Sequence, residues 1–424
     1  MELFWWIIIA SLAVAPGLLL KRRIKTEIQG IFFLWRTKRG LSIVKRLSKY
    51  SIFTYLADLG LVFAFGLFGA FYLIYSEHKR PVKKVIVDYV IFIISAIILI
   101  EPAFIFGNAI MNPVWMTVLL ITGFGGLSLY IIIWATYSVI ADLLIGKTPV
   151  PVLQPVIPGL KIPGAPIDVP LSAWISLLIV LVAHELSHAI VAVREKIRVK
   201  SLGIATAGVF PIGAFAEPDE KQMKREKPKK RLRIYAAGSM MNFVVTFAFI
   251  ALMIPSQAII QPMLLSNYYS EILTVDAGSP AAAAGLAPGM KIYNLNVLNE
   301  EKIAGTPITL ATDHGNLTAT RNATGSIGIT FSTDMKLISN SASHWALFYY
   351  LEIVTWTAML NFAVGMFNFL PFFIFDGARI FEDLADFYAK KLGFKKKIGR
   401  TLVKAMGVVI GLMFVLNLGI FLIQ

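Results

Sequence analysis

Five consecutive residues, His184-Glu185-Leu186-Ser187-His188, carry the most specific chemical signal in the sequence. On a helix, positions four apart share one face, so the imidazoles of His184 and His188 can reach one metal ion. Glu185 lies next to that face, where its carboxylate can take a proton from water held at the metal. The chain has no cysteine, which excludes disulfides, thiolate ligands and a cysteine nucleophile. The pattern predicts a zinc site with Glu185 as the general base.

A catalytic zinc ion usually takes three protein ligands and keeps one position open. The candidate for the third ligand is Asp376, which follows Asn368-Phe369-Leu370-Pro371 near the end of an apolar stretch. Pro371 cannot continue a regular helix, so the chain can turn there and direct Asp376 inward. The alternative role for Asp376 is to cap the amphipathic stretch that follows it.

Two asparagines, Asn242 and Asn368, fall within apolar stretches. Either side-chain amide could bridge neighbouring helices by hydrogen bonds. Either could instead hold a peptide backbone, or stabilise the negative charge that develops on a carbonyl oxygen during hydrolysis. The two roles are evenly balanced for Asn242, and the functional role is favoured for Asn368.

The composition indicates that a membrane surrounds these residues. The chain is 57% hydrophobic and 15% charged, and its mean hydropathy is +0.71. A span needs about 20 mostly apolar residues. Eight stretches meet that length: 3–20, 52–75, 85–107, 115–143, 170–193, 236–262, 345–374 and 402–423. We read 3–20 as an uncleaved span rather than a signal peptide, and expect the glycine-containing stretch 115–145 to be broken or strongly tilted.

The basic residues orient these spans. Residues 21–50 hold ten Lys or Arg and one acid, residues 194–233 hold twelve and five, and residues 376–401 hold seven and four. The positive-inside rule places these loops in the cytoplasm, although Lys79, Arg80, Lys83 and Lys84 then fall outside. Residues 271–336 hold four basic and six acidic residues and fall on the other side. The net charge of +15 therefore fits a membrane topology, and no nucleic-acid partner is expected.

The fold class predicted is an all-α polytopic membrane protein of about eight spans with an inserted, small, β-rich domain. Residues 1–145 would form N-terminal transmembrane helices, and 146–265 the first half of a catalytic core. Residues 266–340, with short strands, turns and a helix at Ala281–Ala284, would form the extracytoplasmic insert. Residues 341–424 would complete the core and end in the last span.

With these motifs in view, the sequence resembles the site-2 protease family, the intramembrane metalloproteases of the M50 type. The resemblance rests on His184–His188, on Asn368, Pro371 and Asp376-Gly377, and on Gly238-Ser239-Met240-Met241-Asn242, which matches the family's GxxxN pattern. Phe375 stands where that family usually has leucine. The resemblance covers about residues 150–424 and leaves 1–145 as additional spans.

The resemblance implies a zinc enzyme of the cell membrane that cleaves the transmembrane helix of a single-span substrate, in regulated intramembrane proteolysis. His184, His188 and Asp376 would bind Zn²⁺, and Glu185 would be the base near the cytoplasmic side. Leu202–Phe215, with Gly213 and Phe215, resembles the family's membrane-dipping β-hairpin, which is thought to accept substrate as an added strand. The insert resembles a PDZ domain and is expected to bind substrate ends or a partner.

Three other readings compete with this one. A prenyl-protein type of membrane zinc protease shares HExxH, but it takes a glutamate as third ligand, and no matching downstream glutamate motif is present. A non-enzymatic membrane scaffold with a PDZ-like loop would not need His184, Glu185, His188 and Asp376 all intact. A metal transporter would use the same site as a passage, and zinc flux into vesicles would reveal it.

Overall fold

The structure is a computed structural model, and it describes most of the chain between residues 26 and 423. The described ranges are 26–29, 32–76, 80–100, 113–149, 157–159, 169–207, 210–265, 268–294, 297, 303–332, 336–338, 341–394 and 397–423. The span expected at 3–20 lies outside these residues.

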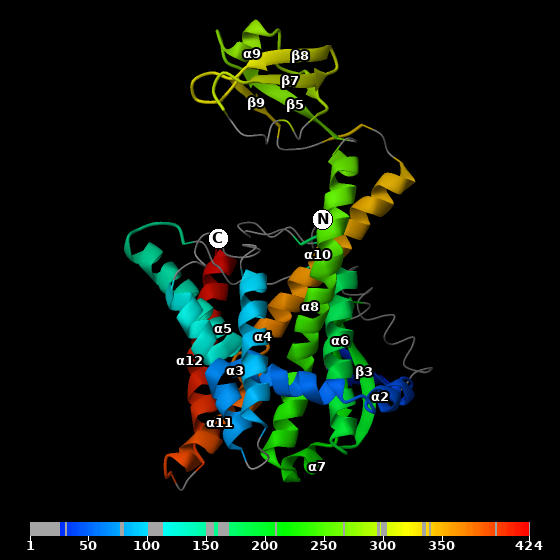
Figure 1. Ribbon diagram of the computed structural model, residues 1–424, viewed down its shortest axis with the longest axis vertical. Helices are drawn as coiled ribbons and strands as arrows, with labels where there is room; N and C mark the ends of the chain where they lie inside the picture. Colours follow the sequence, from blue (N-terminus) through cyan, green and yellow to red (C-terminus); the bar gives the residue numbers. More distant parts are fainter. Residues whose placement is uncertain are drawn as a thin grey trace. The chain divides into compact units, whose positions relative to one another are not determined.

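The chain is mainly helical (Figure 1). The helices are α2 (Leu41–Leu47), α3 (Ile52–Tyr75), α4 (Val82–Ile100), α5 (Pro113–Leu144), α6 (Ala173–Arg194), α7 (Glu220–Arg225), α8 (Pro228–Leu265), α9 (Pro280–Ala283), α10 (Ala342–Phe367), α11 (Asp376–Lys391) and α12 (Gly399–Ile423). The strands are β1 (Thr26–Gln29), β2 (Phe32–Thr37), β3 (Val199–Ala207), β4 (Phe210–Pro218), β5 (Tyr268–Val275), β6 (Lys291–Ile292), β7 (Pro307–Thr312), β8 (Gly315–Thr320), β9 (Ile329–Phe331) and β10 (Lys336–Leu337).

Six helices in the described part of the chain are long and apolar enough to cross a membrane: α3, α5, α6, α8, α10 and α12. They correspond to six of the eight predicted spans. The described part of the expected span 85–107 belongs to α4, which is 19 residues long and carries Lys83, Lys84 and Asp88 near its start. The total of eight spans stays a prediction.

Two of these helices are interrupted at glycines. Helix α3 leaves helical geometry at Phe65 and Gly66, where Gly66 has φ 53°. Helix α5 does so at Gly123, with φ 67°, which confirms the predicted break in 115–145. The two breaks lie against each other, because a Cβ on Gly66 would stand 2.5 Å from the Leu120 carbonyl oxygen. Neither half of α3 reaches the ~20 residues that a span needs. Its first half runs across α6 and α8 (Figure 1).

A four-stranded antiparallel sheet in the order β1-β2-β3-β4 accompanies the helices. The expected hairpin at Leu202–Phe215 is present as β3 and β4. Strand β2 extends it by pairing with β3, so the loop predicted at 21–50 contains two strands that the sequence analysis missed. The expectation of an all-α membrane core was therefore wrong in this respect. In the described residues β4 pairs only with β3, which leaves its other edge without a strand partner.

The chain divides into two compact units, Met1–Ala248 with Trp356–Gln424, and Phe249–Thr355. The second unit contains the insert, whose strands follow the order β10-β5-β6-β7-β8, with β9 pairing β5. Its own core includes Ile272, Ala281, Ile292 and Leu310. The short helix expected at Ala281–Ala284 is present as α9. The likeness of the insert to a PDZ domain stays a prediction.

Candidate metal centre

Helix α6 carries His184 and Glu185 next to each other, and His188 follows one turn later. Both histidines are buried, with 6% and 8% of their surface exposed. Their Nε2 atoms lie 3.1 Å apart, because the four-residue spacing stacks the two side chains on one helix face. The predicted pair therefore presents two ring nitrogens to one point.

The turn after α10 brings Asp376 to that point. Helix α10 ends at Phe367, the chain turns through residues 368–375, and α11 begins at Asp376. The amide of Gly377 donates to the Asn368 carbonyl oxygen at 2.9 Å, which closes the turn. A Cβ on Gly377 would stand 2.0 Å from the Phe369 carbonyl oxygen, so this close approach requires glycine.

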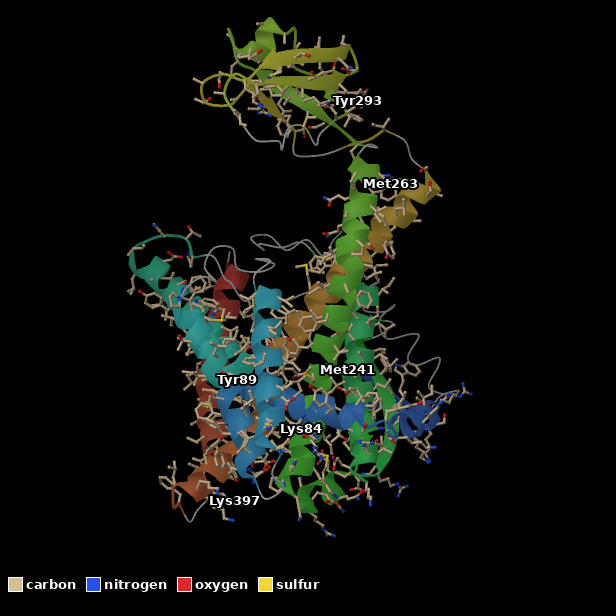
Figure 2. The ribbon with its side chains drawn as sticks, viewed as in Figure 1. Lys84, Tyr89, Met241, Met263, Tyr293 and Lys397 are labelled. Atoms are coloured by element: carbon tan, nitrogen blue, oxygen red, sulfur yellow. The ribbon has the colours of Figure 1, made fainter. Side chains whose placement is uncertain are left out.

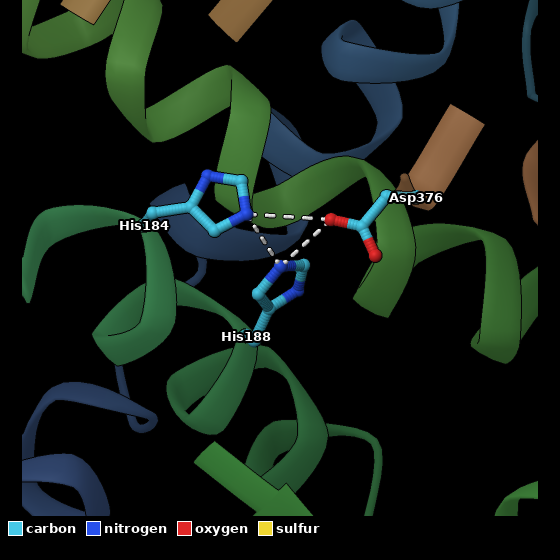
Figure 3. Close-up of side chains that lie close together, drawn as sticks. All are labelled: His184, His188 and Asp376. Atoms are coloured by element: carbon cyan, nitrogen blue, oxygen red, sulfur yellow. Dashed lines mark hydrogen bonds and ion pairs between the residues drawn. The ribbon is translucent and has the colours of Figure 1, made fainter. Parts of the chain in front are cut away.

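The Asp376 carboxylate completes a three-sided group of donor atoms (Figure 3). Its Oδ2 lies 3.3 Å from Nε2 of His184 and 3.0 Å from Nε2 of His188. Burial alone would raise the pKa of the Asp376 carboxyl, but the two histidines beside it outweigh burial and hold the pKa below its ordinary value. An ionised carboxylate is the form that binds a metal.

The spacing of these donors fits zinc. Ligand atoms about 2.0–2.1 Å from a tetrahedral zinc ion are separated from one another by about 3.3 Å. The three separations of 3.0 to 3.3 Å are close to that value. Two imidazoles and a carboxylate are also a ligand set that zinc accepts. His184, His188 and Asp376 are therefore the residues that would hold the metal.

Helix α8 passes directly beside the donor group at Gly238. A Cβ on Gly238 would stand 2.3 Å from Nε2 of His188 and 2.6 Å from Nε2 of His184. Any larger residue would occupy space next to the donor atoms. In the sequence Gly238 is recognisable only as part of a motif, because the spacing of residues does not show how two helices pack.

Helix α8 also contacts the outer ring nitrogens of both histidines. Nδ1 of His188 lies 2.6 Å from the Ile234 carbonyl oxygen, and a carbonyl can only accept, so Nδ1 donates. This hydrogen bond fixes the tautomer that leaves Nε2 free for a metal. The sequence contains no signal for this contact, since the acceptor is a backbone atom.

Asn242 provides the equivalent contact to His184. Its amide group lies 3.1 Å from Nδ1 of His184, and the side chain is fully buried. If Nε2 of His184 binds a metal, Nδ1 carries a proton and needs an acceptor. The amide oxygen of Asn242 would supply this acceptor once the side-chain amide rotates by 180°. Oδ1 as placed has no hydrogen-bond partner, which this rotation would also correct. The position favours orienting a ligand over binding substrate.

Asn368 contacts a metal donor, and Glu185 contacts strand β4. Nδ2 of Asn368 is 2.9 Å from Nε2 of His184, beside the place a metal would take. Oε2 of Glu185 accepts a hydrogen bond of 2.8 Å from the amide of Ala216 on β4. Glu185 thus connects the metal-binding helix to the strand edge that lacks a partner strand in the described residues.

The two remaining predicted residues, Gly213 and Phe215, lie on β4, and no described contact joins them to the histidines. Gly213 pairs with Ala205 on β3. The ring of Phe215 lies over Gly203, where a Cβ would stand 2.1 Å from it, and the Arg36 guanidinium lies 5.7 Å from the ring centre. They belong to the strand that Glu185 contacts through Ala216.

Comparisons with known proteins agree with this geometry. The sequence profile of peptidase family M50 matches residues 172–416, which include the three donor residues and Glu185. A protein of Methanocaldococcus jannaschii, described as uncharacterized, is 28% identical over 238 residues. That alignment covers 54% of this chain and 61% of the relative's length. Because the family profile spans more than half of the 424 residues, this chain is a member of peptidase family M50.

Proposed function

We propose that the protein is an intramembrane zinc metallopeptidase that hydrolyses a peptide bond within or near the transmembrane helix of a single-span membrane protein. The observation that carries this proposal is the donor group of His184, His188 and Asp376, with separations of 3.0 to 3.3 Å. Glu185 adjoins it on the same helix. Membership of peptidase family M50 supports the peptidase activity. The six apolar helices support a location in the membrane.

The residues divide the chemistry between them. Zinc, when bound, supplies Lewis-acid polarisation of the scissile carbonyl and makes water more acidic. Glu185 takes the proton from the attacking water and then delivers it to the leaving amine nitrogen. Its Oε2 accepts from the Ala216 amide, which leaves Oε1 available to carry the proton. The Asn368 amide can donate to the carbonyl oxygen as negative charge develops there.

A helical substrate must unwind before it can be cleaved, because an intact helix engages its carbonyl groups in internal hydrogen bonds. Strand β4 offers a place for the unwound segment, since an edge strand can pair with an added strand. The hydrogen bond from Ala216 to Glu185 supports this arrangement, because it puts the general base next to that edge. Gly213 and Phe215 on β4 would then contact substrate.

The expected location is the cell membrane, with the metal centre near the cytoplasmic side and the insert 266–340 outside. In that position the insert would act as a gate or size filter, binding substrate ends or a partner, while the chemistry stays in the helices. Cleavage of a regulator or its anchor would make the protein part of regulated intramembrane proteolysis. The charge asymmetry of the loops supports this orientation.

The deciding experiment is reconstitution of the purified protein in liposomes with a single-span test substrate. We expect about one zinc ion per chain, cleavage within or near the substrate's span, and loss of cleavage when a chelator removes zinc. Restoring zinc should restore cleavage. A zinc-loaded protein that cleaves nothing and carries zinc across the liposome membrane would replace the protease proposal with a transporter. A protein that binds peptide ends without zinc would favour the scaffold.

A further inference from the structure

Part of the chain outside the family match packs directly behind the metal centre. The matched segment is 172–416, whereas α3 and α5 precede it. The first half of α3 is buried from Ala57 onward, and Ala57, Leu61, Val62 and Phe63 have no exposed surface. A span that faced lipid would expose one side, so this half-helix belongs to the protein interior.

An ion pair joins α3 to the segment of α8 that orients His188. Asp58 is 5% exposed and accepts from Arg233 at 2.7 Å through Nε and at 2.9 Å through Nη2. Arg233 also donates to Glu195 at 2.9 Å, at the end of α6. The next residue, Ile234, is the one whose carbonyl accepts from Nδ1 of His188. The bidentate pair therefore fixes the backbone immediately before that carbonyl.

A close helix crossing reinforces the ion pair. A Cβ on Gly60 would stand 3.0 Å from the Ala236 carbonyl oxygen and 3.0 Å from Cβ of Met240. These two residues flank Gly238, the glycine beside the metal donors. Met241, labelled in Figure 2, marks the same turn of α8. Small residues allow helices in membranes to approach this closely.

Helix α5 makes the matching contact on the other side of the centre. The hydroxyl of Ser128 is fully buried, and its single proton is shared between the Phe124 carbonyl oxygen of its own helix at 2.8 Å and the Met366 carbonyl oxygen at 3.0 Å. A Cβ on Gly125 would stand 2.5 Å from the Phe369 carbonyl oxygen. Met366 and Phe369 bracket Asn368, and the turn they belong to leads to Asp376. This contact supports the backbone of the turn that carries the third donor.

We infer that the first half of α3 and the Gly123–Ser128 segment of α5 form a brace that positions the metal donors, with Asp58 and Ser128 as its positioning residues. The inference rests on the proposed function, since it concerns the same metal centre. Each half of the brace acts on one side: Asp58 on the α8 backbone behind His188, and Ser128 on the turn before Asp376. A change in either removes support behind one donor, and substitutions behind metal ligands typically cost about 10–100-fold in metal affinity.

The test compares Asp58→Asn and Ser128→Ala with two matched controls in the full chain. Asp386→Asn removes another partly buried carboxylate, one that accepts from the backbone amides of Ile398 and Gly399 rather than from α8. Ser138→Ala removes another α5 hydroxyl, one that bonds to the Trp134 carbonyl of its own helix. Zinc affinity is measured by chelator competition, site geometry by the absorption spectrum of the cobalt-substituted protein, and folding by the melting temperature of the metal-free protein.

We expect Asp58→Asn and Ser128→Ala each to lower zinc affinity about 10-fold, the lower end of what substitutions behind a ligand cost, and to alter the cobalt spectrum. The two control substitutions should leave the zinc affinity and the cobalt spectrum unchanged. Wild-type affinity and spectrum in the two brace variants would overturn the brace, as would equal losses in all four proteins. If Asp58→Asn does not fold, Ser128→Ala decides alone. Failure of the wild-type protein to bind zinc or cobalt would instead reject the proposed function.

Discussion

Gly238 and His188 approach each other so closely that a Cβ on the glycine would stand 2.3 Å from Nε2 of the histidine. The same Cβ would stand 2.6 Å from Nε2 of His184. The absence of a side chain on α8 thus leaves room for the donor atoms of α6. Gly238 is therefore a structural requirement of the metal centre, because a side chain at this position would occupy the space of the ligand atoms.

Gly238→Ala should therefore lower zinc affinity about 100-fold, the upper end of what outer-shell substitutions cost. The melting temperature of the metal-free protein should fall only slightly, because the helix preference for alanine over glycine, about 1 kcal/mol, offsets part of the cost of moving the two rings. The matched control is Gly411→Ala on α12, where the nearest atom to a new Cβ is 3.8 Å away. Unchanged zinc affinity in Gly238→Ala would show that the metal binds elsewhere.

Asp376→Asn should lose most of its zinc, because the amide keeps the shape of the side chain but removes the charge that the ligand supplies. Elemental analysis of the purified protein measures this directly. Asp386→Asn is the control on the same helix, since that carboxylate accepts from the backbone amides of Ile398 and Gly399 instead. A full zinc ion in Asp376→Asn would remove Asp376 from the ligand set.

Glu185→Gln separates an enzyme from a binding protein. Loss of general-base assistance should reduce the cleavage rate about 10²–10⁴-fold. Zinc content should stay normal, since His184, His188 and Asp376 are unchanged, and the glutamine oxygen can still accept from the Ala216 amide. The expected product is a folded, zinc-loaded, inactive protein that still captures its substrate. Glu220→Gln, on exposed α7, is the control.

Two results would contradict this role of Glu185. Loss of zinc along with activity would make Glu185 a ligand rather than a base. Cleavage at the wild-type rate would remove the proposed mechanism altogether, and a scaffold or a transporter would become the leading interpretation.

Asn242 should act through the His184 ring. Asn242→Leu removes the group facing Nδ1 and should lower zinc affinity about 10–100-fold. Asn242→Asp keeps an acceptor at that position and should retain more of the affinity. Asn417→Leu, at another fully buried asparagine, is the control, because its amide donates to Thr136 and Met413 on α5 and α12. Equal affinity in the leucine and aspartate variants of Asn242 would exclude the orienting role.

The absence of cysteine makes the orientation directly measurable with single introduced thiols. Asn316→Cys, on an exposed position of β8, should react with a membrane-impermeant maleimide added outside intact cells. Lys224→Cys, on exposed α7, should react only after the membrane is opened. The reverse pattern would overturn the predicted topology, and with it the extracytoplasmic position of the insert.

Several features of this protein follow from the sequence because they depend on neighbours along the chain. The four-residue spacing of His184 and His188 is enough to put both rings on one face of a helix. Pro371 ends α10 early, as a residue without a backbone N–H must, and Gly123 interrupts α5 at the expected stretch. The apolar stretches are long enough to be recognised as spans by length alone.

Other features depend on which surfaces meet, and periodicity does not report that. The strands β1 and β2 lie within a stretch whose charge indicated only a loop, and they form because β3 offers an edge to pair with. The insert was recognised from its short strands and turns, but the pairing of β5 with both β6 and β9 depends on contacts between distant segments. The 52–75 stretch has the composition of a span, yet its break at Gly66 turns half of it across the other helices.

The chemical identity of the centre follows from residue type and local spacing, because these encode a ligand pair, a base and a third carboxylate. The contacts that hold these residues in place form only when the chain folds. The Ile234 carbonyl behind His188, the Ala216 amide on Glu185 and the missing side chain of Gly238 are backbone contacts between distant segments. Every residue has a backbone carbonyl, and every residue except proline has a backbone N–H, so no pattern of side chains marks the ones that a fold will use.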